Sequence, residues 1–131
     1  MDTSKEYILM CEKALPDMGG WGYNDGDFCV RKGRVYVWNH VHAERNGWGT
    51  GEKCIPLFRQ DQLQEIARHH KEGWYDTREI NNLCLFWNWW RRVELSSYCH
   101  ADEVTMEQLW LAFVMKEKFN KKWNGLNWVT P

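Results

Sequence analysis

The sequence predicts an α+β fold: a small antiparallel β-hairpin or sheet packed against about four α-helices, in a single domain over residues 1–131. Three observations predict it. A chain of 131 residues suits one hydrophobic core. Apolar residues recur at helical spacing in four segments, two of which open with a capping box. Between the first two of these segments, two β-branched and aromatic runs flank a two-residue turn, as in a β-hairpin.

The first helix follows the capping box of residues 3–6, in which Thr3 is the expected cap and Glu6 its partner. Apolar residues then continue at helical spacing, so the helix should run to about Lys13 or Ala14. Pro16 and the glycines that follow it are expected to end it.

The hairpin strands are expected at residues 27–31 and 34–38, joined by Lys32-Gly33. Alternation in the second strand places Val35 and Val37 on one face and the other side chains on the opposite face. One face of the sheet should therefore be packed and the other partly solvated.

Residues 43–53 hold three glycines within five residues around Trp48, a composition that favours a mobile surface loop with a large ring at its tip. The alternative is a loop whose ring folds back onto the sheet. Residues 54–57 should form a short edge strand, because the residue before Pro56 avoids the helical region.

Three more helices are expected. Residues 60–71 form an amphipathic helix closed by Gly73, and Thr77 caps the next helix. The last helix begins at the capping box of Thr105 and continues to a stop at Gly125. In the helix after Thr77, apolar residues form one stripe that others widen, so we expect this helix at the centre of the core. The stripe comprises Ile80, Leu83, Cys84, Trp87 and Trp90, and Leu85, Phe86 and Trp89 widen it.

Charge and cysteine usage narrow the function. Lysine and arginine number 17 against 18 acids, for a net charge of -1, which excludes the broad positive field of a protein that coats nucleic acid. Residues 1–14 mix acids with bases and contain no uninterrupted apolar stretch, so neither a signal peptide nor a membrane span is expected. Five cysteines without a CxxC pair suit reduced thiols. We therefore expect a cytoplasmic protein with no membrane partner.

Metal binding has a weak signal. His40 and His42 would share one face of a strand, and Cys54 or the adjacent Cys99 and His100 could add ligands for zinc. Structural zinc sites usually contain two short ligand pairs, and adjacent strand residues point to opposite faces. We expect no metal and no cofactor.

Catalysis has even less support. Residues 99–102 contain a cysteine, a histidine and an aspartate, but catalytic triads are normally assembled from distant segments. The acids are spread singly, and none of the P-loop, dinucleotide-binding, zincin or hydrolase motifs is present. The sequence predicts a protein that is not an enzyme.

Two groups of residues are candidates for binding a ligand or partner. Tryptophan supplies ten residues, and tryptophan is enriched at binding hot spots. Trp48 could close over a small nucleotide-like ligand while Arg45 or Arg59 pairs with its phosphate. Stacking rings beside cations could instead bind nucleic acid. The residues of this second group are Trp89, Arg91 and Arg92, together with Lys116, Lys118, Lys121 and Lys122 around Phe119 and Trp123.

Several longer stretches carry a resemblance: residues 1–8 and 10–14, residues 55–66, residues 105–118 and the turn Trp123-Asn124-Gly125. In these the chain resembles a family of small uncharacterised proteins encoded by phages and prophages of Gram-positive bacteria. In that family a Gly-Asp strand follows the first helix, as Gly26-Asp27 does here. The chain departs from the pattern at residues 21–53 and 75–102.

The resemblance implies a genomic setting and no residue role, because the family has no known activity. It favours a phage- or prophage-encoded accessory protein, a non-enzymatic interaction factor that acts on a host protein, with a host-defence protein as one candidate. The alternatives are a protein that binds or sequesters a nucleotide-like small molecule and an accessory protein that binds nucleic acid. The oligomeric state stays open.

Overall fold

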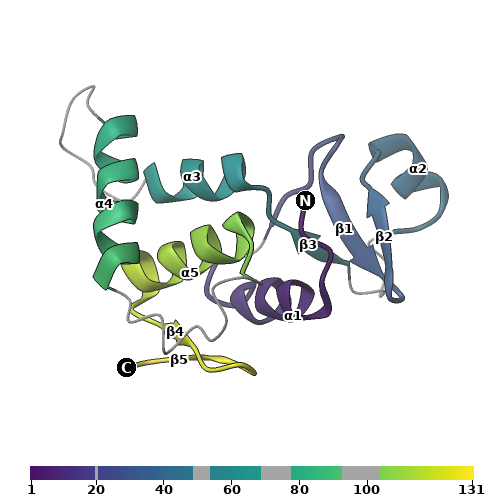
Figure 1. Ribbon diagram of the computed structural model, residues 1–131. Coiled ribbons are helices and arrows are strands. Elements are labelled where there is room, and N and C mark those ends of the chain that lie inside the picture. Colours follow the sequence, from purple (N-terminus) through teal and green to yellow (C-terminus); the bar gives the residue numbers. More distant parts are fainter. Residues whose placement is uncertain (20, 49–53, 69–77, 93–103) are drawn as a thin grey trace.

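The computed structural model describes residues 1–19, 21–48, 54–68, 78–92 and 104–131. Within these ranges it contains five helices, one three-stranded sheet and one two-stranded sheet, which confirms the α+β class. Figure 1 shows the three-stranded sheet at one end, helix α4 at the other end, and α1, α3 and α5 between them. The elements are α1 (Lys5–Ala14), β1 (Phe28–Arg31), β2 (Arg34–Val37), α2 (His40–Arg45), β3 (Ile55–Leu57), α3 (Gln60–Arg68), α4 (Arg78–Arg92), α5 (Met106–Phe119), β4 (Lys122–Trp123) and β5 (Trp128–Val129).

The larger sheet is antiparallel, with strand order β2-β1-β3. The predicted hairpin is confirmed, and both turn residues, Lys32 and Gly33, have positive φ angles, 50° and 72°. Two such residues form the turn whose twist matches that of the flanking strands. The predicted edge strand is also confirmed as β3, where Pro56 is tolerated because an edge strand can lack one N–H donor.

Helix α1 ends at Ala14 as predicted, but its cap is Ser4 rather than Thr3. Ser4 has an extended backbone, and its Oγ accepts a hydrogen bond from the N–H of Tyr7 at 3.1 Å. The buried hydroxyl of Tyr7 donates to the carbonyl of Phe58 at 2.5 Å. This bond connects the first helix to the chain that leads from β3 into α3.

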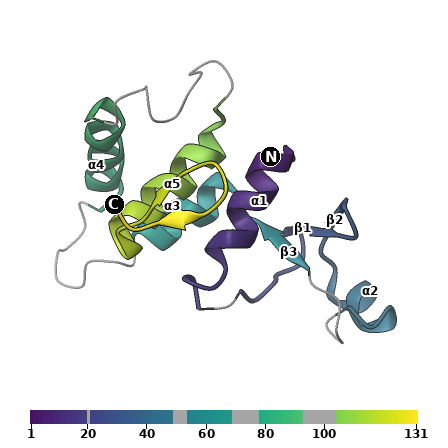
Figure 2. The same ribbon diagram turned by 90° about the horizontal axis from the view of Figure 1, so that it is seen from below.

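Helix α5 occupies the centre of the core, so the prediction that the helix after Thr77 is central was wrong. All eight residues from Gln108 to Met115 are buried. The helix packs against α1, α3, α4 and β4, and Figure 2 shows it among these elements. A helix surrounded in this way is apolar around its whole circumference, whereas the main contacts of α4 within the described residues are with α3 and α5.

The end of α5 also differs from the prediction. Thr105 caps its start as expected, but the helix ends at Phe119 and not near Gly125. Asn120 adopts the left-handed conformation with φ of 51°, and its N–H donates to the carbonyl of Lys116. The chain then reverses into the hairpin of β4 and β5, which the sequence did not predict.

A buried carboxylate joins the starts of the first and last helices. Asp2 accepts hydrogen bonds from the Ser4 N–H, the Thr105 hydroxyl and the Gln108 amide, each at 2.8 Å. Ser4 and Thr105 are the two helix caps. Both caps therefore lie in one hydrogen-bonded cluster between segments more than a hundred residues apart.

Among the described residues, no helix combines the length and apolar character needed to cross a membrane. Gly73 and Thr77, the predicted end of α3 and cap of α4, lie outside the described residues.

Candidate functional site

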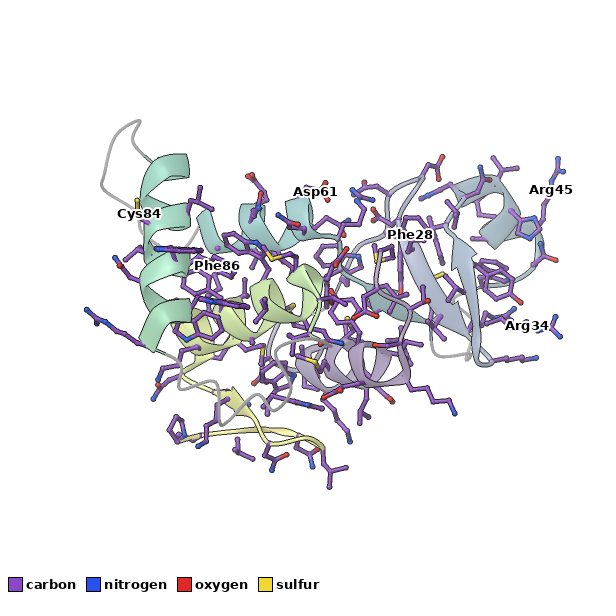
Figure 3. All side chains as sticks on the ribbon, in the orientation of Figure 1. Phe28, Arg34, Arg45, Asp61, Cys84 and Phe86 are labelled. Atoms are coloured by element: carbon purple, nitrogen blue, oxygen red, sulfur yellow. The ribbon has the colours of Figure 1, made fainter. Side chains whose placement is uncertain are left out.

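Most of the predicted binding residues lie at two ends of the molecule, and Arg59 lies between them, just before α3. Figure 3 shows Arg45 at the end formed by the β1–β2 hairpin and α2, and Cys84 and Phe86 of α4 at the other end. Trp48 belongs with Arg45, and Trp89 and Arg92 belong with α4. The side chain of Arg91 lies outside the described part of the chain. The structure therefore separates the two predicted groups, and each must be judged alone.

Trp48 is half-buried against the hairpin rather than carried at a loop tip, so the alternative expectation holds. Its ring lies 5.2 Å from that of Tyr36, 6.0 Å from that of Trp38 and 5.1 Å from that of His42, measured between ring centroids. The guanidinium of Arg31 lies 5.1 Å from the Trp48 ring centroid, within cation–π distance. Part of the surface of this ring thus contacts the protein itself.

Helix α2 explains this placement. Asn39 caps it by accepting a hydrogen bond from the N–H of His42. After the helix, the Trp48 N–H donates to the carbonyl of Ala43 at 2.9 Å, which folds the chain back toward the sheet. The sequence did not predict this helix, because its six residues are too few to show a helical pattern and the glycines that follow it suggested a loop.

The predicted histidine pair is wrong in its geometry. His40 and His42 lie on a helix and not on a strand, so their side chains project about 160° apart around the helix axis. His42 packs edge-on to Trp48. No group of three metal-ligating side chains occurs in the described ranges, and Cys99 and His100 lie outside them.

Arg59 is held by two carboxylates. Its Nη1 lies 3.1 Å from Asp27, and its Nε and Nη2 lie 3.0 and 3.2 Å from Asp61. These hydrogen bonds lower the pKa of Asp61, and Asp61 in turn raises the pKa of Arg59. Asp27 is only 3% exposed and also accepts a hydrogen bond from Gln62 at 2.7 Å. Arg59 thus ties the start of β1 to the start of α3, and a phosphate would have to displace its acids.

Helix α4 packs through three aromatic residues. Phe86 is 4% exposed and stacks on Trp110 of α5, with centroids 4.1 Å apart and planes 9° apart. Trp89 lies 5.6 Å from Phe113, and Trp90 is half-buried beside Phe86 at 6.4 Å. Residues 86, 89 and 90 share one side of a helix, which defines the inner face of α4.

Three residues of the stripe that the sequence assigned to the core are exposed instead of buried. Leu83 and Trp87 are each 59% exposed, and Cys84 is exposed as well. These three residues form the outer face of α4, with Leu83 and Trp87 four residues apart and therefore adjacent on its surface. The prediction that this stripe packs in the core was wrong for Leu83, Cys84 and Trp87, because the widening residue Phe86 makes the contact with α5 instead. It holds for Trp90, which packs half-buried against the core, and the side chain of Ile80 lies outside the described part of the chain.

Two of the four predicted lysines near the C-terminal end of α5 have partners within the chain. Lys116 donates to Asn120, and Lys121 forms an ion pair with Asp17 at 2.6 Å. Arg92, at the end of α4, is exposed.

No known protein family, curated protein or solved structure matches this chain.

Proposed function

We propose that this chain is a non-enzymatic protein-interaction factor that binds a partner protein through the outer face of α4. The observation that carries the proposal is the exposure of Leu83 and Trp87, each 59%, on a helix whose other side is already packed. A helix that is apolar on both sides is expected to be buried on both sides.

The chemistry of the outer face fits a helix-in-groove complex. Leu83 and Trp87 have the spacing with which an amphipathic helix places two anchors in an apolar groove. Tryptophan is among the side chains that contribute most to binding when a partner desolvates them. The partner should therefore present an apolar groove that admits an indole ring.

The resemblance to phage and prophage proteins of Gram-positive bacteria supports a host protein as this partner. A small accessory protein in an infected or lysogenic cell meets host components in the cytoplasm, where the five cysteines would stay reduced. A host-defence protein is one candidate of this kind.

The two alternative functions have weaker support. In the group predicted to bind nucleic acid, Lys116 and Lys121 already bond to Asn120 and Asp17. A nucleotide-like ligand at Trp48 would compete with Arg31, Tyr36 and His42 for the ring. The buried indole N–H of Trp38 has no hydrogen-bond partner among the described residues, but the indoles of Trp21, Trp110 and Trp123 share that property, so it does not single out a ligand site.

Site-specific photo-crosslinking tests the proposal. A photoreactive phenylalanine analogue replaces Leu83 in one variant and Val41, an exposed residue of α2, in a matched control, and both are expressed in a Gram-positive host. We expect one host protein to be linked through position 83 and not through position 41. The linked protein is then purified and titrated with the unmodified chain, with Trp87→Ser and with Val41→Ser.

Trp87→Ser should weaken this complex about 30-fold, the effect of losing a hot-spot side chain, and Val41→Ser should leave it unchanged. The absence of a specific adduct at position 83, or equal affinity of Trp87→Ser and the unmodified chain, would rule the proposal out. An adduct between two copies of the chain would instead identify the outer face as a self-association surface.

A further inference from the structure

Strand β2 is an edge strand, and its backbone has a defined open side. Trp38, which follows β2, bonds to the residues that precede β1. Its N–H donates to the carbonyl of Asp27 at 2.6 Å, and its carbonyl accepts from the N–H of Gly26 at 2.9 Å. Bonding direction alternates along an antiparallel strand, so Val35 and Val37 direct their N–H and C=O groups away from β1.

Nothing in the described ranges pairs with that open side. The backbone groups of Val35 and Val37 have no hydrogen-bond partner among the described residues. The chain that leaves β2 enters α2, where the N–H of His40 donates to Asp25 and not to Val35 or Val37. An open row of donors and acceptors on an edge strand is a template for an added strand.

The apolar face of the sheet also extends past the core at β2. Val30 of β1 is buried between Ile55 of β3 on one side and Val35 on the other, since the three are paired across the sheet. Helix α1 packs against β3. Figure 2 shows that β1 lies between β3 and β2, so β2 is the strand farthest from α1. Val35 and Val37 consequently remain 40% and 56% exposed.

Charge selects the kind of strand that fits. Residues 28–43 contain three cationic side chains, Arg31, Lys32 and Arg34, and no acid. Arg34 is exposed on the face of β2 opposite the two valines. Pairing β2 with a second copy would bring two such basic hairpins together, and like charges across a ladder are destabilising. An acidic strand carries the charge opposite to that of the hairpin, so its carboxylates would attract these cations.

We propose that the open edge of β2 takes an extended acidic segment of a partner protein as an added β-strand. Backbone hydrogen bonds form to Val35 and Val37, apolar residues of the segment cover the two valines, and an alternate carboxylate pairs with Arg34. This surface is separate from the outer face of α4 and stands or falls independently of the function proposed there.

The probe for the test is a short blocked peptide of alternating valine and glutamate, and the matched control peptide replaces glutamate by lysine. Binding is measured by fluorescence anisotropy, and backbone amide exchange is followed by NMR. We expect the acidic peptide to bind and to slow exchange at the amides of Val35 and Val37 by about tenfold or more.

Two variants locate the binding. Val35→Pro removes one outward N–H that has no hydrogen-bond partner in the described part of the chain, so the sheet should still form, and the peptide should bind about tenfold more weakly. Arg34→Glu should reverse the preference between the two peptides. Val41→Ser is the control and should bind the acidic peptide normally, and urea unfolding confirms that each variant is folded.

Several results would overturn the proposal. They are equal binding of both peptides, undiminished binding to Val35→Pro, or exchange protection at residues other than those of β2. Protection of Val35 and Val37 that rises with protein concentration without peptide would identify a second copy as the occupant. Stronger binding of single-stranded DNA at the same amides would identify a nucleic acid.

Discussion

The division of α4 into an inner and an outer face predicts opposite effects for two neighbouring aromatic residues. Phe86→Ala removes a ring that is 4% exposed and stacked 4.1 Å from Trp110, and such a truncation costs about 3–4 kcal/mol. Trp87→Ala removes a larger ring that is 59% exposed. Its cost should stay below about 1 kcal/mol, because little burial is lost and alanine favours the helix.

Urea unfolding followed by far-UV circular dichroism measures both variants without depending on tryptophan emission. A domain of this length has a total stability of about 5–15 kcal/mol, so Phe86→Ala should lower the unfolding midpoint strongly and the melting temperature by about 10–15 °C. Trp87→Ala should unfold near the unmodified protein. If the two variants are destabilised equally, or Trp87→Ala more, the assignment of the two faces is refuted.

Three further predictions follow from buried groups and thiols. Asp27→Asn should lower the free energy of unfolding, measured by urea titration, by about 2–4 kcal/mol, because Arg59 loses its buried partner. Asp61→Asn removes the exposed partner of Arg59 and should cost less than about 1 kcal/mol. Equal effects of the two variants would contradict the burial argument. Burial raises the pKa of the Cys11 thiol from 9.0 to about 12 and that of Cys29 to about 11, so their protonated forms stabilise the fold below pH 9 and that stability is lost as the pH rises through those values. The urea midpoint should therefore be lower at pH 10 than at pH 8, and an unchanged midpoint would count against it. Iodoacetamide should label exposed Cys84 in the folded protein and reach Cys11 and Cys29 only in urea, which mass spectrometry of the peptides would report; prompt labelling of Cys11 would place that thiol at the surface.

Local signals predicted much of the fold because they act over a few residues. The two-residue turn at Lys32 and Gly33 determined the hairpin, and the capping pattern at Thr105 located the start of α5. The capping pattern misplaced the cap of α1 by one residue, at Thr3, since the neighbouring Ser4 could cap the helix equally well and does so. Local signals also failed at Asn120, whose left-handed conformation ended α5 where the residue pattern still permitted a helix.

The placement of α4 could not be predicted, because its sequence is apolar on two sides. Periodicity identifies both faces but cannot tell which one meets α5, and that choice depends on how Phe86 stacks on Trp110. The clusters around Asp2 and Asp27 were missed for a related reason. Their hydrogen bonds join residues 32 to 106 positions apart in the chain, and no local pattern marks such pairs.

The open edge of β2 is a third feature that alternation alone did not reveal. The pattern placed Val35 and Val37 on one face, as the register confirms. It did not show that α1 covers the sheet at β3, or that among the described strands β2 pairs with β1 alone. Exposure of these valines depends on strand order, which is a property of the assembled sheet.

Native mass spectrometry of the tagged protein, recovered gently from a Gram-positive host and compared with Leu83→Ser/Trp87→Ser, tests the proposed interaction most directly. The proposal predicts a stoichiometric complex with one host protein for the unmodified chain and a bare, folded chain for the variant. A host protein retained equally by both, or a bound nucleotide-sized mass in place of a protein, would contradict it.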